Sequence, residues 1–247
     1  MLSLKELFAE PYASIVCYPR PSKTEWSRRL NELERLGVVA VEFEGEKSLF
    51  NKPILGKGCV GIVVIAYADG YKYALKIRRV DADRNSMRRE AKLLKKANSL
   101  SLGPEVRKVS RNFLLMQFIE GSFLLPWLER TRGKCRLRNV LRSILEQCFV
   151  LDLAGLDHGE LSCATKHIIV DAEDRPFLLD FESASDERKA ANVTSVCQFL
   201  LLHGETATRI RRRLGEVDET ALLSSLRKYK HHPSRENFET LMETCGL

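Results

Sequence analysis

The sequence predicts an α+β protein with two lobes, and three observations lead to this fold class. The first half of the chain is rich in strand-like segments, whereas the second half has helical periodicity. A glycine-rich loop lies between two strand-like runs in the first half. The chain has 247 residues, of which 44% are hydrophobic and 30% are charged, so it is long enough for a sizeable core and has an ordinary globular composition.

The first fifty residues predict a strand, a helix and a second strand. Ser14–Tyr18 favours a strand that ends at two prolines. An amphipathic helix follows, with Ser22 or Thr24 as its cap and Gly37 at its end, and Val38–Phe43 alternates as a half-buried strand does. The apolar face of this helix is predicted to consist of Trp26, Leu30, Leu33 and Leu36.

The remaining elements follow from periodicity and turn residues. Ile54–Val80 predicts strands interrupted by Asp69-Gly70, which is a strong hairpin signal. Further along the chain we expect a helix at Arg84–Lys96, a buried strand at Phe113–Ile119, an apolar helix at Val140–Leu153, short strands at Ile168–Val170 and Pro176–Phe181 around a turn at Asp171–Asp174, and helices from Glu187 onward.

The glycine-rich loop matches the pattern GxGxxGxV in full. Dinucleotide-binding folds share part of this pattern, but there the third glycine opens a helix. Here a strand-like run follows, so the loop is predicted to connect two strands and to close over the phosphates of ATP. A Walker A loop is excluded because no GK[ST] follows. The nucleotide-binding residues predicted here are Gly56, Lys57, Gly58, Cys59, Val60, Gly61 and Val63.

Lys76 lies fifteen residues after Gly61, on the next predicted strand. A lysine on such a strand is normally solvated, but at this distance from a glycine loop we expect it to neutralise the α- and β-phosphates of ATP. A buried lysine needs a carboxylate partner, and Glu90 follows fourteen residues later on a predicted basic helix.

Two further motifs complete a set of four. His158-Gly159-Glu160 is followed by a short predicted hairpin and then by Asp180-Phe181-Glu182. In this order and spacing, the motifs resemble the protein-kinase-like superfamily and its atypical, RIO-like branch. Within that branch the chain is most similar to the small archaeal predicted Ser/Thr kinase family that includes an archaeal tRNA kinase forming 2′-phosphouridine.

The resemblance covers residues 54–202 and implies a bilobal protein-kinase-like fold, with a small β-rich N-lobe and a helical C-lobe. The expected parts are an N-terminal extension (1–51) packed on the N-lobe, the N-lobe itself (52–118), and the C-lobe with basic C-terminal helices (119–247). The A-P-E motif that eukaryotic-type kinases carry after the metal-binding aspartate is missing, which argues against docking of extended peptides.

The resemblance also implies roles for individual residues. Glu160 is expected to orient the attacking hydroxyl and accept its proton, and Asp180 to bind Mg²⁺. The family has aspartate where this chain has Glu160, and its metal-binding asparagine is absent, so the spacing leaves Thr165 or His167 as the second metal ligand. The residues that remain have these expected roles: Lys166 stabilises charge on the γ-phosphate, Met116 is the gatekeeper, Gln117 and Ile119 bind adenine in the interlobe hinge, and His158 is buried and braces the loop.

The net charge of +7 is unevenly distributed. Lys72–Lys96 holds ten basic and three acidic residues, and Arg130–Arg142 is also strongly basic, whereas Leu151–Asp186 holds nine acidic residues against two basic ones. A polyanion could lie on the basic surfaces while one of its hydroxyls reaches the acidic centre. We therefore predict ATP and Mg²⁺ as cofactors and tRNA as a partner, with no DNA and no membrane. The seven cysteines are scattered without a CxxC pair, which predicts small buried hydrophobes in a reducing cytoplasm.

Four functions remain open from the sequence. The first is an ATP-dependent RNA kinase acting on a tRNA 2′-hydroxyl, and the second is an atypical protein serine/threonine kinase. The third is a non-catalytic pseudokinase, for which the change to Glu160 and the missing asparagine speak. The fourth, a small-molecule phosphotransferase, fits a basic protein poorly because an acceptor pocket for cationic compounds is acidic.

Overall fold

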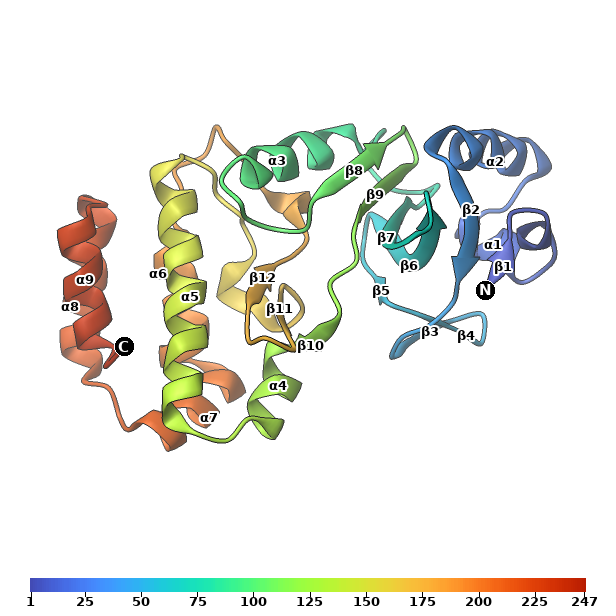
Figure 1. The fold of residues 1–247 in the computed structure, drawn as a ribbon. Coiled ribbons are helices and arrows are strands. Elements are labelled where there is room, and N and C mark those ends of the chain that lie inside the picture. Colours follow the sequence, from blue (N-terminus) through green and yellow to red (C-terminus); the bar gives the residue numbers. More distant parts are fainter. The chain divides into compact units, whose positions relative to one another are not determined.

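The structure, a computed structural model, describes all residues from Met1 to Leu247 and contains two compact units. The first unit comprises Met1–Lys95 and Pro104–Phe118, and the second comprises Lys96–Gly103 and Ile119–Leu247. The first is built on a β-sheet and the second is mainly helical (Figure 1). The predicted α+β, kinase-like fold class is thereby confirmed. No helix combines the length and the apolar surface that a membrane-spanning segment needs.

The main sheet belongs to the first unit, and its neighbouring strands are antiparallel in the order β1-β2-β6-β7-β9-β8, with β5 paired to β6. Asp69 and Gly70 have positive φ values and form the tight β6–β7 turn that the sequence predicts. The strands of this unit are β1 (Leu2–Ser3), β2 (Val38–Glu42), β3 (Lys47–Leu49), β4 (Lys52–Ile54), β5 (Gly56–Lys57), β6 (Gly61–Ala68), β7 (Tyr71–Arg78), β8 (Val106–Val109) and β9 (Phe113–Gln117).

Side chains alternate along a strand, so the two faces of the sheet carry different residues. On β7, Leu75 and Ile77 belong to a core that also includes residues of the two helices that precede β2. Lys76, between them, lies on the opposite face together with its ion-pair partner Glu90. The helical segments of the first unit are η1 (Glu6–Phe8), α1 (Tyr12–Val16), α2 (Lys23–Leu36) and α3 (Arg88–Asn98), whose last residues belong to the second unit.

Helix α2 begins and ends where its capping residues predict. The Ser22 hydroxyl accepts a hydrogen bond from the Glu25 backbone N–H at 3.1 Å, and Gly37 ends the helix with φ at 76°. Trp26, Leu33 and Leu36 are buried as expected, which fixes the face that meets the sheet.

The predicted strand at Ser14–Tyr18 is wrong, because Tyr12–Val16 forms the short helix α1. A five-residue apolar run fits a strand and a helical turn equally well, so periodicity could not separate the two. Its side chains Ile15 and Val16 join the same core as α2.

A buried arginine connects α1 and α2 to the sheet. The Arg29 side chain is fully buried, and its guanidinium donates to the carbonyl oxygens of Val16 at 2.6 Å and Arg78 at 2.7 Å. It also forms an ion pair with Glu25 at 2.8 Å. The planar guanidinium can satisfy several acceptors at once, which makes this burial possible.

The second unit packs helices around a central one, α5, which contacts α6 and α7, while α8 and α9 lie side by side (Figure 1). A small sheet has the order β10-β11-β12, and its strands β11 and β12 form the hairpin between the predicted catalytic loop and Asp180. Its elements are β10 (Gly121–Phe123), α4 (Leu124–Arg130), α5 (Lys134–Leu153), η2 (Leu161–Lys166), β11 (Ile168–Asp171), β12 (Pro176–Leu178), η3 (Phe181–Ser183), α6 (Asn192–Cys197), the π-helical turn η4 (Gln198–Leu202), α7 (Gly204–Leu214), α8 (Glu219–His231) and α9 (Arg235–Thr244).

All seven cysteines are free thiols, and four are buried as predicted. The other three, Cys59, Cys135 and Cys163, are exposed, so the prediction that each cysteine is a buried hydrophobe is wrong for them. Cys59 lies in the glycine loop and Cys163 in η2 (Leu161–Lys166), both close to predicted site residues.

Replacing Arg29 by methionine is expected to lower the free energy of unfolding by about 3 kcal/mol or more, because Val16 and Arg78 would keep buried carbonyl groups without donors. Urea titration of the two proteins measures this difference. The matched control is Arg28→Met at the neighbouring position, where the side chain is 70% exposed, and we expect a change within about 0.5 kcal/mol. Equal effects of the two substitutions would contradict the structural role given to Arg29.

Candidate active site

The glycine loop joins β5 to β6, as its sequence context predicts. Gly56 pairs with Val63 across these strands, and the Gly58 N–H donates to the Gly61 carbonyl oxygen at 2.8 Å, which closes the turn. A Cβ atom on Gly61 would lie 3.1 Å from both the Lys76 side chain and the Ile77 carbonyl oxygen. The third glycine of the motif therefore leaves the space in which the Lys76 side chain lies.

Lys76 and Glu90 form a buried ion pair. Lys76 Nζ lies 2.8 Å from Glu90 Oε1, and the side chains are only 5% and 4% exposed. In the β6–β7 register Lys76 stands opposite Val63, so the lysine and a predicted nucleotide-binding residue share one face of the sheet. An amine held in this way has a fixed position, as a group that binds phosphates needs.

The predicted hinge residues occur at the end of β9 and just beyond it. Met116 is half-buried and stands opposite Ala74 on β7, while Gln117 is exposed. The Gln117 N–H donates to the Glu105 carbonyl oxygen at 2.8 Å, so this donor is engaged within the sheet. Ile119 is the first residue of the following segment of the second unit and is half-buried.

In the second unit, Glu160 follows Gly159 in a loop held by its neighbours. Glu160 Oε1 accepts a hydrogen bond from the Ser183 hydroxyl, and Glu160 Oε2 lies 3.2 Å from His167 Nε2. The carboxylate remains 43% exposed. Two partners thus orient Glu160 while solvent can still reach it, as a group that accepts a proton from a substrate requires.

His158 braces this loop from within, as the sequence predicts. Its ring is fully buried, and Nε2 donates to the carbonyl oxygen of Leu179, the residue before Asp180, at 2.9 Å. Its backbone N–H donates to Asn192 Oδ1 at 2.8 Å. Burial lowers the pKa of His158 to about 4, so the ring is neutral at physiological pH. His158 therefore ties together the two segments that carry Glu160 and Asp180.

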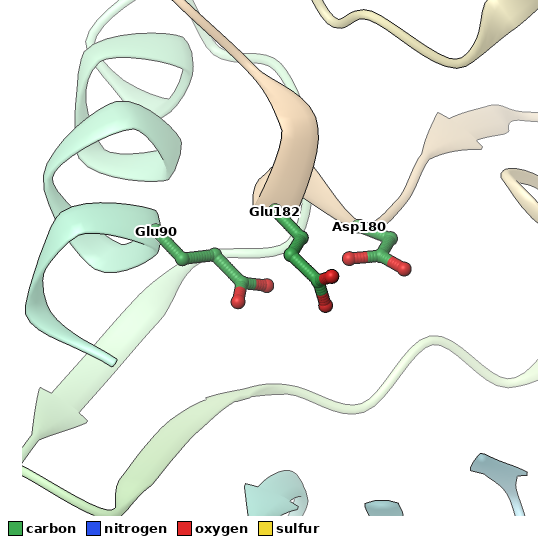
Figure 2. A group of neighbouring side chains, drawn as sticks. All are labelled: Glu90, Asp180 and Glu182. Atoms are coloured by element: carbon green, nitrogen blue, oxygen red, sulfur yellow. The ribbon is translucent and has the colours of Figure 1, made fainter. Parts of the chain in front are cut away.

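Asp180 has a backbone conformation that a side chain other than glycine rarely adopts, with φ at 66° and ψ at 77°. The turn η3 begins directly after it and brings Glu182 beside it, so that carboxylate oxygens of the two residues lie within 4.8 Å of each other (Figure 2). Carboxylate oxygens are the ligands that Mg²⁺ prefers in proteins. This pair fits a magnesium ion, and only Asp180 of the two is a ligand expected from the sequence.

The other predicted ligands lie on or next to η2. His167 directs Nε2 toward Glu160, and Thr165 is exposed on η2. Lys166, between them, is also exposed. The structure thus brings His167 to the predicted proton acceptor, whereas the partner of Asp180 within this unit is Glu182, which the Asp-x-Glu spacing could have suggested.

The stability of the fold is expected to depend on the protonation of His158. The unfolded chain takes up a proton near pH 6.5, but the buried ring does so only near pH 4, so unfolding is favoured increasingly as the pH falls through this range. The variant His158→Gln keeps an amide donor for the Leu179 carbonyl group and does not titrate. Urea titrations at pH 7, 6 and 5 should show a shallower loss of stability in the variant, and identical pH profiles would contradict the assignment.

Comparison with known proteins agrees with this geometry. The RIO domain family matches residues 65–193, which is just over half of the chain and extends from β6 to the start of α6. The chain is also similar to an uncharacterized protein of Methanocaldococcus jannaschii, with 28% identity over 117 residues that make up 47% of this chain and 98% of that protein. The chain therefore belongs to the RIO domain family of atypical kinases, which transfer a phosphoryl group from ATP to an alcohol group.

Proposed function

We propose that this protein is an ATP-dependent RNA kinase that phosphorylates a ribose 2′-hydroxyl of tRNA, with a uridine of the variable region as the acceptor by family resemblance. The observation that carries the proposal is the contrast in charge along the chain. Nine acidic residues gather in Leu151–Asp186, among them Glu160, Asp180 and Glu182, within a protein of net charge +7. A polyanion attracted to the basic surfaces could present one hydroxyl to these carboxylates.

The segment after Asp180 supports RNA over protein as the acceptor. Only residues 184–191 separate η3 from α6. This stretch is tied back to the catalytic loop, because Ser185 pairs with Asp157 and Arg188 forms an ion pair with the same aspartate at 2.6 Å. So short and anchored a segment offers little backbone for an extended peptide, and a protein substrate is the less favoured alternative.

Each predicted site residue has a part in the proposed reaction. Backbone amides of the glycine loop and the Lys76 amine bind the phosphates of ATP, and Met116, Gln117 and Ile119 contact adenine. Glu160, oriented by Ser183 and His167, accepts the proton of the 2′-hydroxyl. The hydroxyl oxygen bonds to the γ-phosphorus while the bond from that phosphorus to the leaving oxygen of ADP breaks. Lys166 stabilises charge on the transferred phosphoryl group.

The carboxylates of Asp180 and Glu182 suit Mg²⁺, which when bound neutralises charge on the β- and γ-phosphates. We propose that these two residues hold the metal. Thr165 and His167 stay candidates for a further ligand. The first structural unit, apart from its N-terminal extension at 1–51, is proposed as the kinase N-lobe and the second as the C-lobe.

The decisive experiment incubates the protein with γ-labelled ATP, total tRNA and total protein, and asks which fraction takes the label. We expect labelled tRNA. Because alkaline cleavage of RNA needs the free 2′-hydroxyl beside the broken bond, a 2′-phosphorylated nucleotide should survive alkali within a dinucleotide. Transfer to protein with none to tRNA would establish the protein kinase alternative instead.

Lys76→Ala and Asp180→Ala should each slow phosphoryl transfer on the order of 10³-fold or more, if each residue supplies ~4 kcal/mol of transition-state stabilisation. Asp180→Gly should be as inactive as Asp180→Ala and yet at least as stable as the wild type, because glycine adopts a φ of 66° without strain. Single-turnover rates and thermal melting curves measure both effects. Turnover retained by the Asp180 variants would show that other residues hold the metal.

A further inference from the structure

Helix α3 presents a row of positive charges on its exposed face. Arg88, Arg89, Lys92 and Lys95 are all exposed, and we call these four residues the α3 cation row. The other side of the helix is buried and contains Glu90, the ion-pair partner of Lys76. Arg88, Lys92 and Lys95 are three to four residues apart, so they follow one stripe about 10 Å long.

No carboxylate forms an ion pair with any member of the α3 cation row, whereas five of the ten arginines on the helices of the second unit have a carboxylate partner. Even Lys96, the next basic residue of α3, lies 3.5 Å from Asp186. The paired arginines elsewhere include Arg136 with Asp174, Arg142 with Glu239, Arg209 with Glu129 and Glu205, and Arg235 with Glu146 and Glu239. The charges of these arginines are therefore compensated within the protein, whereas those of the α3 cation row are not.

The α3 cation row is also unfavourable for the helix that carries it. Like charges three and four residues apart repel each other, as for Arg88 with Lys92 and Lys92 with Lys95. Arg88 and Arg89 lie in the first turn, where the helix dipole disfavours cations. The unpaired Lys228 and Lys230 differ in this respect, because they lie in the last turn of α8, where the dipole favours them. Helix α3 thus bears a repulsion that an external anion would relieve.

We propose that the α3 cation row binds the phosphate backbone of the substrate RNA; the proposal rests on the function proposed above and specifies where the RNA docks. Helix α3 has no exposed aromatic or large aliphatic side chain beside the row. Protein interfaces bury apolar residues at their centre, and single-stranded bases stack on aromatic rings, so neither kind of partner fits this surface well. Regularly spaced cations with long, flexible side chains suit phosphates.

The test compares two full-length variants that lose the same four positive charges. In the first, Arg88, Arg89, Lys92 and Lys95 are replaced by glutamine, which has a helix propensity close to that of arginine and lysine. The matched control carries Lys23→Gln, Arg227→Gln, Lys228→Gln and Lys230→Gln, which removes four exposed cations that form no ion pair and lie elsewhere on the chain. Filter binding gives the tRNA dissociation constant at several salt concentrations, and melting curves and ATP binding show whether each variant is intact.

We expect the first variant to bind tRNA at least tenfold more weakly. On a plot of the logarithm of the binding constant against the logarithm of the salt concentration, its slope should be shallower by about one for each phosphate that the helix no longer neutralises. Its KM for tRNA should rise while its affinity for ATP stays as in the wild type, and the control should change tRNA binding less than twofold. Should the fourfold variant melt early, the double variant Lys92→Gln/Lys95→Gln replaces it, with Lys228→Gln/Lys230→Gln as control and at least a threefold loss expected.

Unchanged tRNA binding by an intact α3 variant, or an equal loss in the control, would overturn the docking surface. These outcomes are separate from the fate of the proposed function, which depends on whether the wild type labels tRNA. A wild type that labels tRNA alongside an α3 variant of unchanged KM leaves the function and removes the docking site. A wild type that labels no tRNA refutes the function, while the binding titration still decides whether α3 contacts RNA.

Discussion

The ion pair between Lys76 and Glu90 is the interaction on which the first unit depends. An amine and a carboxylate that are almost completely buried are tolerated only as partners, so each fixes the other in place. Lys76 has to occupy the sheet face opposite the core of α1 and α2, and Glu90 has to lie on the inner side of α3. Gly61 in turn has to lack a side chain, because a Cβ atom there would press against Lys76. The need to pair the buried amine with the buried carboxylate is thus met by three features together: the register of β6 and β7, the glycine loop and the orientation of α3.

In the second unit a hydrogen-bond network, without a buried ion pair, positions the segments that carry site residues. Asn192 donates to Asp152 and to the Leu156 carbonyl oxygen, and it accepts from the backbone of His158. His158 then donates to the Leu179 carbonyl oxygen. Through these contacts the start of α6 supports both segments that carry site residues, and the Asn192 and His158 side chains that make them are buried. Such a network of satisfied, buried polar groups holds a loop in one conformation.

The sequence predicts those parts of the structure that depend on local pattern. The caps of α2, the Asp69-Gly70 hairpin, the strand-to-strand glycine loop and the pairing of Lys76 with Glu90 all follow from residue type and spacing. The family itself follows from the order of four motifs. These features are short-range, or they are set by a spacing that a strand or helix converts into geometry.

What the sequence could not supply depends on contacts between distant segments. Arg29 occupies the inner face of α2, where its charge argues for solvent, and only the carbonyl groups of Val16 and Arg78 explain its burial. The bracing role of Asn192 has no local signal either, since its partners lie 34 to 40 residues earlier. Glu182 is a different case: the Asp-x-Glu spacing suggests it as a ligand, but its closeness to Asp180 requires the tight turn of η3 and the positive φ of Asp180.

The brief connection between η3 and α6 bears on how such an enzyme is controlled. Many kinases are switched by phosphorylation of a long, mobile segment at this place, which becomes ordered when its new charge finds arginine partners. Here the arginine of that stretch, Arg188, already has a partner in Asp157, and Ser185 is paired with the backbone of the same residue. The segment is ordered without a modification. In this fold the ordering of that segment therefore does not depend on a phosphate group to supply a partner for its arginine.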